Sequence, residues 1–118
     1  MERKLSLHSN GDIAELYSEG DKTQRRIGFH YSGWFDKETF EREYIQGKVE
    51  IGAYRRGIEE LCNHGPIDEA VRISGNDGCL KLTKINGRVI LLGFENSRLD
   101  TGVMEVDLAP EEFMKLIR

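Results

Sequence analysis

The chain holds three histidines and two cysteines, the residue types best suited to bind a metal ion or to act in nucleophilic catalysis. Cys62 and His64 lie two positions apart at the end of a predicted helix, where side chains at i and i+2 point in different directions. His8, His30 and Cys79 form none of the C-x₂-C or H-x₃-H pairs that hold zinc. We therefore expect no metal site and no cofactor.

Enzymatic catalysis would need a nucleophile, a base and an oxyanion donor held together. The chain has no G-x-S-x-G elbow, and Ser74 precedes a glycine in a predicted turn. The adjacent acids at 59–60 and 111–112 lie on predicted helices, where neighbouring side chains diverge by about 100°. The sequence therefore predicts no catalytic residues and no enzymatic activity.

The stretch 31–36, Tyr-Ser-Gly-Trp-Phe-Asp, is followed closely by several acidic residues. A tryptophan in a polar, glycine-containing bend beside acidic side chains is typical of a protein–protein hot spot with an electrostatic rim. An alternative is that Trp34 and Phe35 close one end of the core, as aromatic side chains often do. Under the first interpretation, the residues predicted to contact a partner are Trp34, Asp36, Glu38, Glu41 and Glu43.

Composition limits the classes of protein to which the chain can belong. It has 118 residues, 38% hydrophobic residues and a net charge of −4. Its apolar residues are patterned rather than scattered, so residues 1–118 are predicted to fold as one domain. The acidic charge argues against nucleic-acid binding and would suit a basic protein partner.

The sequence also bears on location. No run approaches the roughly 20 apolar residues of a membrane span, and the start lacks the apolar stretch of a signal peptide. We therefore expect a cytoplasmic protein that does not bind membranes. In that compartment the two cysteines are expected to be buried free thiols.

The predicted elements are organised around a hairpin at 86–87, Asn-Gly, which favours a type I′ turn between two strands. The strands are 79–85 and 88–94, and a two-residue loop sets Lys84 opposite Val89. That register places the following residues on one face: Leu80, Leu82, Val89 and Leu91.

Further strands flank this hairpin and precede it. Strands at 70–74 and 101–108 extend it into a four-strand antiparallel meander. The first part of the chain is predicted to form strands at 4–7, 13–17 and 26–31. In the last of these, alternation puts three residues on one face: Ile27, Phe29 and Tyr31.

Two helices complete the pattern. Apolar residues recur at a helical period between 51 and 63, and Gly65 is well placed to end that helix. A second helix begins at Pro110, a favoured first-turn residue. The first helix is expected to bury one stripe: Ile51, Tyr54, Ile58, Leu61 and Cys62.

The segment 36–46 fits either of two structures. Phe40 and Tyr44 share a helix face at i and i+4, but the same residues also alternate with Arg42 as a strand would require. We favour a short helix. The overall prediction is an α+β fold with one antiparallel sheet of about six or seven strands and two helices, one central and one C-terminal.

The order of these elements over residues 26–118 resembles that of WapI-type bacterial immunity proteins. The shared pattern is a helix Tyr54-x₃-Ile58-x₂-Leu61, strands at 71–74 and 80–82, the Asn86-Gly-Arg-Val89 turn, and a final helix from Pro110. The resemblance implies a protein that neutralises a competitor's toxin, here a basic domain, by binding and occluding it. It implies no catalytic residues.

Two further functions are compatible with the sequence. One is a small-molecule-binding or minor enzymatic domain, with a pocket between sheet and helix near Tyr54 and His30. The other is a structural subunit of an oligomer that pairs through an exposed strand edge.

Overall fold

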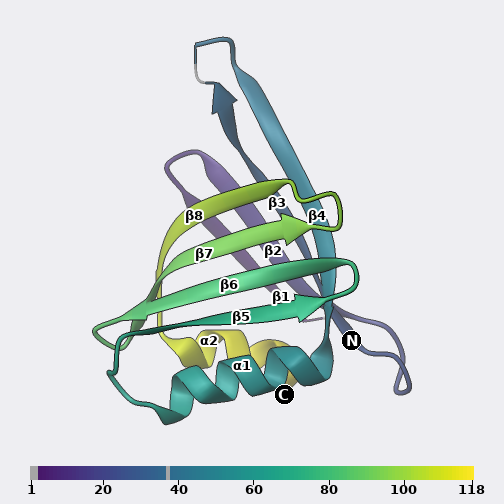
Figure 1. Ribbon diagram of the computed structural model, residues 1–118, viewed down its shortest axis with the longest axis vertical. Coiled ribbons are helices and arrows are strands. Elements are labelled where there is room, and N and C mark those ends of the chain that lie inside the picture. The colour runs from purple at the N-terminus through teal and green to yellow at the C-terminus, as the bar shows by residue number, and fades with distance from the viewer. Residues whose placement is uncertain (1–2, 37) are drawn as a thin grey trace.

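The computed structural model describes residues 3–36 and 38–118, in which it contains eight β-strands, two α-helices and a short 3₁₀-helix (Figure 1). One antiparallel sheet has the order β1 (Lys4–Ser9), β2 (Asp12–Glu19), β3 (Arg26–Asp36), β4 (Glu41–Glu50). A second has the order β5 (Glu69–Gly75), β6 (Gly78–Ile85), β7 (Arg88–Asn96), β8 (Thr101–Leu108). The helices are α1 (Ile51–Asn63), α2 (Pro110–Met114) and η1 (Lys115–Ile117).

This arrangement confirms the predicted mixture of helices with antiparallel strands. The strand count was roughly right, at eight in the described chain rather than six or seven. The strands divide into two sheets of four, each a simple meander, instead of forming one sheet. The four-strand meander predicted for the second half is the β5–β8 sheet.

Asn-Gly turns close the first hairpin of the first sheet and the central hairpin of the second. Asn10 and Gly11 have φ angles of 52° and 85°, and Asn86 and Gly87 have 51° and 79°. Positive φ at both central residues is the requirement of a type I′ turn, which asparagine and glycine meet at low cost. The turn at 86–87 is therefore where the sequence predicts it, and the turn at 10–11 has the same φ signs.

The register of the β6–β7 hairpin differs from the prediction beyond its second pair. Lys84 lies opposite Val89 as expected, but Thr83 lies opposite Leu91 because a bulge leaves Ile90 without a partner on β6. The bulge lets Val89 and Leu92, which are three positions apart, both face the core. The prediction that Leu91 would share that face is therefore wrong, and Leu92 takes its place.

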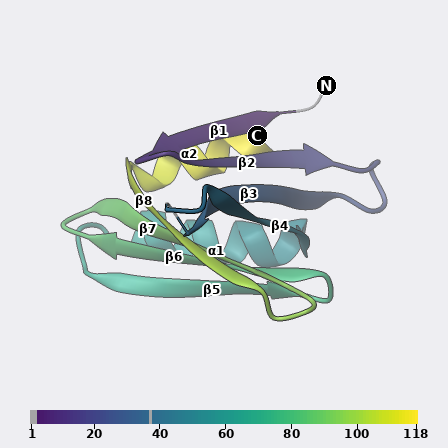
Figure 2. The same ribbon diagram turned by 90° about the horizontal axis from the view of Figure 1, so that it is seen from above.

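The two sheets pack face to face with their strands crossing at a steep angle, and the helices lie together at one end of the space between them (Figures 1 and 2). Phe94 of β7 links the inner faces, since its ring centroid lies 5.0 Å from that of Tyr31 and 5.6 Å from that of Phe29. At one margin the sheets also meet through backbone atoms, where the Lys48 amide donates to the Asp77 carbonyl at 3.3 Å. One continuous hydrophobic core results.

Helix α1 has the predicted bounds and buries Tyr54, Ile58 and Leu61, whereas Ile51 and Cys62 of the predicted stripe are only partly buried. Its interior glycine has a packing reason, because a Cβ at Gly57 would lie 2.7 Å from the Ile73 side chain on β5. The shorter helix begins at Pro110 as expected. No helix in the described ranges is long and apolar enough to cross a membrane.

The expectation of a helix within 36–46 is wrong. Residues 41–50 form β4, which pairs along β3 and buries Ile45 and Val49 in the core. Pairing with β3 therefore overrides the weak helical spacing of the segment. Because β2 pairs with β3 only as far as Ser32, the outer part of the β3–β4 hairpin extends beyond the rest of the sheet (Figure 1). We call residues 33–36 and 38–43 the tip.

Candidate functional site at the hairpin tip

Trp34 is the centre of the tip and lies on the outer face of the first sheet, away from the second sheet. It pairs across the strands with Arg42, whose guanidinium carbon lies 4.5 Å from the Trp34 ring centroid. The Phe40 ring packs edge-on against the Trp34 ring, with 6.4 Å between the ring centroids. The indole also lies against Gly11, where a Cβ would be 2.6 Å from Nε1. Trp34 is thus half-buried, in contact with a cation and with the β1–β2 turn.

Arg42 is fixed by three hydrogen bonds. Its Nε donates to the Ser32 hydroxyl at 2.9 Å, and its NH2 group donates at 3.0 Å to the carbonyl oxygens of both Gly11 and Ser32. The guanidinium is therefore held in place over the Trp34 ring. Such a pairing orders the indole without covering it completely.

Large, solvent-exposed apolar side chains lie around Trp34 and Arg42. Phe40 is 78% exposed, Tyr44 is 70% exposed and Ile13 is 44% exposed. Tyr44 and Ile13 lie on either side of Ser32 in neighbouring strands, on the same face as Trp34. A shallow depression of about 100 Å³ separates them. The outer face near the tip therefore presents a band of exposed apolar surface.

The predicted acidic rim divides into two groups. Asp36 accepts a hydrogen bond from the Glu38 amide at 2.9 Å, so it stabilises the turn, while Glu38 and Glu41 are exposed. Glu43 alternates with Arg42 and points to the opposite face, in phase with buried Ile45. The structure thus brings Trp34 and all four predicted acids into the tip, but Glu43 faces away from Trp34.

Glu43 belongs to an acidic group at the open margin between the sheets. Burial raises the pKa of its carboxyl, and the nearby charges of Asp12 and Asp100 raise it further. The adjacent Tyr31 hydroxyl donates to the Val103 carbonyl at 3.4 Å. Burial and the charges of Asp12 and Glu43 raise the pKa of Tyr31 to about 12, against a smaller lowering by Arg42. Tyr31 therefore stays protonated at neutral pH.

Three residues of this surface were not predicted as site residues: Arg42 and Phe40 in the tip, and Tyr44 next to it. Their alternation was noted as a strand pattern, but the preference for a helix removed the reason to pair Arg42 with Trp34. The alternative in which Trp34 closes the core does not match its outward position. The side chain of Phe35 lies outside the described part of the structure.

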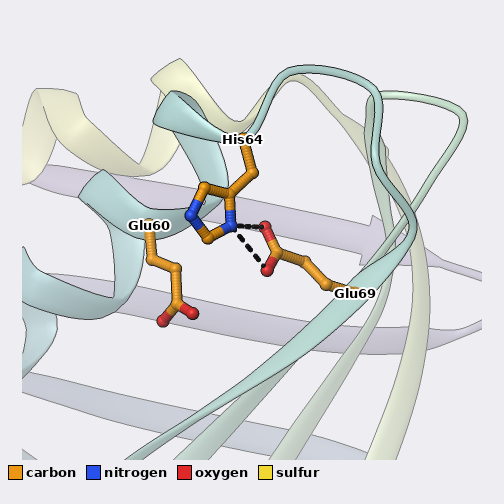
Figure 3. Close-up of side chains that lie close together, drawn as sticks. All are labelled: Glu60, His64 and Glu69. Carbon is orange, nitrogen blue, oxygen red and sulfur yellow. Dashed lines mark hydrogen bonds and ion pairs between the residues drawn. The ribbon is translucent and has the colours of Figure 1, made fainter.

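A second polar cluster lies at the C-terminal end of α1 (Figure 3). Lys84, which is completely buried, donates to the carbonyl oxygens of Leu61 at 2.8 Å and Gly65 at 2.7 Å. Its ammonium group also lies 3.3 Å from Glu69. His64 Nδ1 contacts both carboxylate oxygens of Glu69, at 2.9 and 3.0 Å. Lys84 therefore caps the helix from inside the protein.

The charge state of Glu69 follows from these contacts, since the hydrogen bond from His64, with a smaller contribution from Lys84, lowers its pKa. Glu60, one helical turn before His64, completes a group whose potential ligand atoms all lie within 4.8 Å of one another. This group was not predicted, because His64 was considered only together with Cys62. The signal was present in the Glu60-x₃-His64 spacing, which puts both residues on one helix face.

The structure does not bring Tyr54 and His30 together, as the pocket hypothesis would need. Tyr54 is fully buried and donates its hydroxyl to the Phe113 carbonyl at 2.7 Å. His30 is exposed on the outer face of the first sheet, where its ring lies 5.2 Å from that of Tyr17. The two cysteines are both free as expected and Cys79 is buried, but the expectation of burial is wrong for Cys62, which is partly exposed at the end of α1.

An open cleft of about 540 Å³ lies between the β2–β3 turn and the start of α1. Four of its lining residues are cationic, and Glu50 is the one acid among the described lining residues. The first turn of α1 contains no acidic side chain, so its partial positive charge adds to theirs. The cationic residues are Lys22, Arg25, Arg26 and Arg55.

No protein-family model, curated protein or solved structure matches this chain. The resemblance to WapI-type immunity proteins therefore stays a prediction based on the order of elements. Function has to be inferred from the side-chain geometry of the tip and of the α1 terminus.

Proposed function

We propose that this protein is a non-enzymatic binding module that holds a basic protein partner at the tip of the β3–β4 hairpin. The observation that carries the proposal is the ordered, exposed aromatic surface on a projecting hairpin. Trp34 is held by Arg42, and Phe40 and Tyr44 are largely exposed beside it. Tryptophan, tyrosine and arginine are the residues that most often dominate the binding energy of protein interfaces.

The conformation of Phe40 supports a role in binding rather than in folding. Its φ angle is 60°, a left-handed conformation that costs a residue with a Cβ on the order of 1–2 kcal/mol. Its side chain is 78% exposed, so little burial offsets that cost. Backbone strain of this kind is often found at functional sites, which supports a binding role for Phe40 beside Trp34.

The charges around the tip indicate the chemistry of the partner. Asp36, Glu38 and Glu41 lie at the far end of the hairpin, and an acidic rim around an aromatic centre favours lysine and arginine side chains opposite. Together with the resemblance in element order, this supports a finer proposal. The partner would be a basic toxin domain, which the tip would occlude.

The test is an affinity capture from the source cell and from competing bacteria. The tip variant combines Glu38→Lys and Glu41→Lys, which leaves the Asp36 turn hydrogen bond intact. The matched control combines Glu59→Lys and Glu111→Lys, two exposed acids on the helices. We expect one basic protein to bind the wild type and the control but not the tip variant. With the purified partner, the wild type and the control should bind more tightly than the tip variant.

Equal capture by both charge variants would overturn the assignment of the tip. Co-purification of a small molecule without a protein would instead favour a ligand-binding domain. Inhibition of the captured partner's own activity, measured with wild-type protein and the tip variant, distinguishes occlusion from simple association.

A further inference from the structure

The end of α1 gathers three side chains that commonly bind metal ions. Glu60 and His64 are one turn apart on the helix, and Glu69 reaches them from the start of β5 (Figure 3). The Glu60 carboxylate has no hydrogen-bond or ion-pair partner among the described residues. This carboxylate is therefore free to take a ligand without breaking an existing contact.

The spacing of these groups already approaches that of a metal site. In a tetrahedral zinc site with bonds of about 2.0–2.1 Å, neighbouring ligand atoms lie about 3.3 Å apart. His64 Nδ1 and Glu69 Oε2 are 2.9 Å apart, and all three ligand atoms lie within 4.8 Å of one another. Rotation of the flexible Glu60 side chain would close the remaining gap, and the backbone need not move.

We propose that Glu60, His64 and Glu69 form a zinc-binding site, with a fourth position open to water or to a donor from another molecule. One imidazole nitrogen and two carboxylates suit Zn²⁺. They suit Ca²⁺ poorly, because that ion takes six to eight oxygen ligands. The bound ion would tie the end of α1 directly to the start of β5.

Lys84 is the group that opposes a cation here, because its ammonium lies 3.3 Å from Glu69 Oε1. Its charge is already engaged by the carbonyl oxygens of Leu61 and Gly65, which leaves Oε2 to face His64 and the ion. The two carboxylates outweigh the single ammonium, so the empty group with neutral His64 carries net negative charge. The site therefore still attracts a divalent cation.

The test is calorimetric titration of the full chain with zinc chloride, together with the visible absorption of added Co²⁺, whose d–d bands report tetrahedral coordination. Wild-type protein should bind one equivalent of either ion. Glu60→Gln and His64→Ala should each weaken binding at least about tenfold and remove the cobalt bands. Glu59→Gln, a change of the adjacent exposed acid, should leave binding unchanged.

Two further measurements keep the test decisive. Cys62→Ser should bind as the wild type does, because the proposed ligands exclude that thiol. Circular dichroism should show that Glu60→Gln is folded, as expected for a side chain without partners. The proposal is overturned if wild-type protein binds neither ion, if binding persists in Glu60→Gln and His64→Ala, or if it is lost in Cys62→Ser.

Discussion

The tip and the end of α1 use the same chemical device for different purposes. At each place a cationic side chain donates to two backbone carbonyl oxygens: Arg42 to Gly11 and Ser32, and Lys84 to Leu61 and Gly65. Lys84 is enclosed by the core and is completely buried. Arg42 is partly exposed and makes a cation–π contact with the Trp34 ring.

This difference in surroundings determines what each cation contributes. If Lys84 is removed, the buried Leu61 carbonyl loses its partner where water cannot easily replace it, and the Gly65 carbonyl and Glu69 each lose one partner. If Arg42 is removed, water can reach the carbonyl groups that it leaves. We therefore expect Lys84 to act mainly on stability and Arg42 mainly on the order of the tip.

The largest effect is expected from Lys84→Met. Loss of its charge-assisted hydrogen bonds, one of them to the buried Leu61 carbonyl, should lower the free energy of unfolding by about 1.5–3 kcal/mol. Urea denaturation measures this loss. Lys81→Met, an exposed change on the same strand, should cost far less. Similar losses for the two variants would mean that the buried network contributes little.

Arg42→Met should have a smaller effect, about 1–2 kcal/mol, from lost charge-assisted hydrogen bonds and the cation–π contact at a partly exposed site. Trp34 is the single tryptophan, so its fluorescence reports on the tip alone. Emission should shift to longer wavelength in folded Arg42→Met. Arg42→Lys should not restore the wild-type spectrum, because an ammonium cannot reproduce the planar fork. An unchanged spectrum in both would show that Arg42 does not order the indole.

Phe40→Asn should raise the free energy of unfolding by about 0.5–1 kcal/mol, since asparagine tolerates the left-handed conformation better than phenylalanine does. Thermal denaturation measures the gain. Tyr44→Asn, a polar replacement of an exposed aromatic within β4, should instead lower stability, because that residue is in a strand. If Phe40→Asn is destabilising, the ring of Phe40 contributes to folding after all.

The smallest effect is expected from Glu43→Gln and depends on pH. The pKa of Glu43 is raised in the folded protein, so ionisation costs stability as the pH rises above the unfolded value near 4.5. The variant should be more stable than wild type at pH 7, by less than about 1 kcal/mol for a partly exposed group, and equal to it near pH 3. Urea denaturation at both pH values measures the difference. A gain that is the same at both would exclude the electrostatic cause.

The burial of Lys84 could be predicted from the sequence more fully than the arrangement of the tip. The Asn86-Gly87 turn set Lys84 opposite Val89, on the face shared by Leu80 and Leu82, so its burial was implicit in the predicted register. The bulge at Ile90 left no local signal, since the residue is an ordinary strand former. It arises because Val89 and Leu92 must both reach the core.

The tip was harder to predict because its arrangement depends on pairing between strands. Phe40 and Tyr44 fit a helix as well as a strand, and only the partnership with β3 decides between them. The outward position of Trp34 follows from its alternation with Tyr31 and Gly33 along β3. Its contact with Gly11 comes from a turn more than 20 residues earlier, which no local pattern contains.

The cationic cleft described above gives the molecule a lasting electrical asymmetry. The acids of the tip and the cations beside α1 lie near opposite ends of a molecule 42 Å long (Figure 1). Despite a net charge of −4, the protein is therefore an electric dipole that turns in the field of a charged neighbour. At physiological ionic strength, dissolved salt screens the electric field of such a neighbour beyond roughly 8 Å. The protein would therefore be oriented only during the final approach. A basic partner would then meet the tip first.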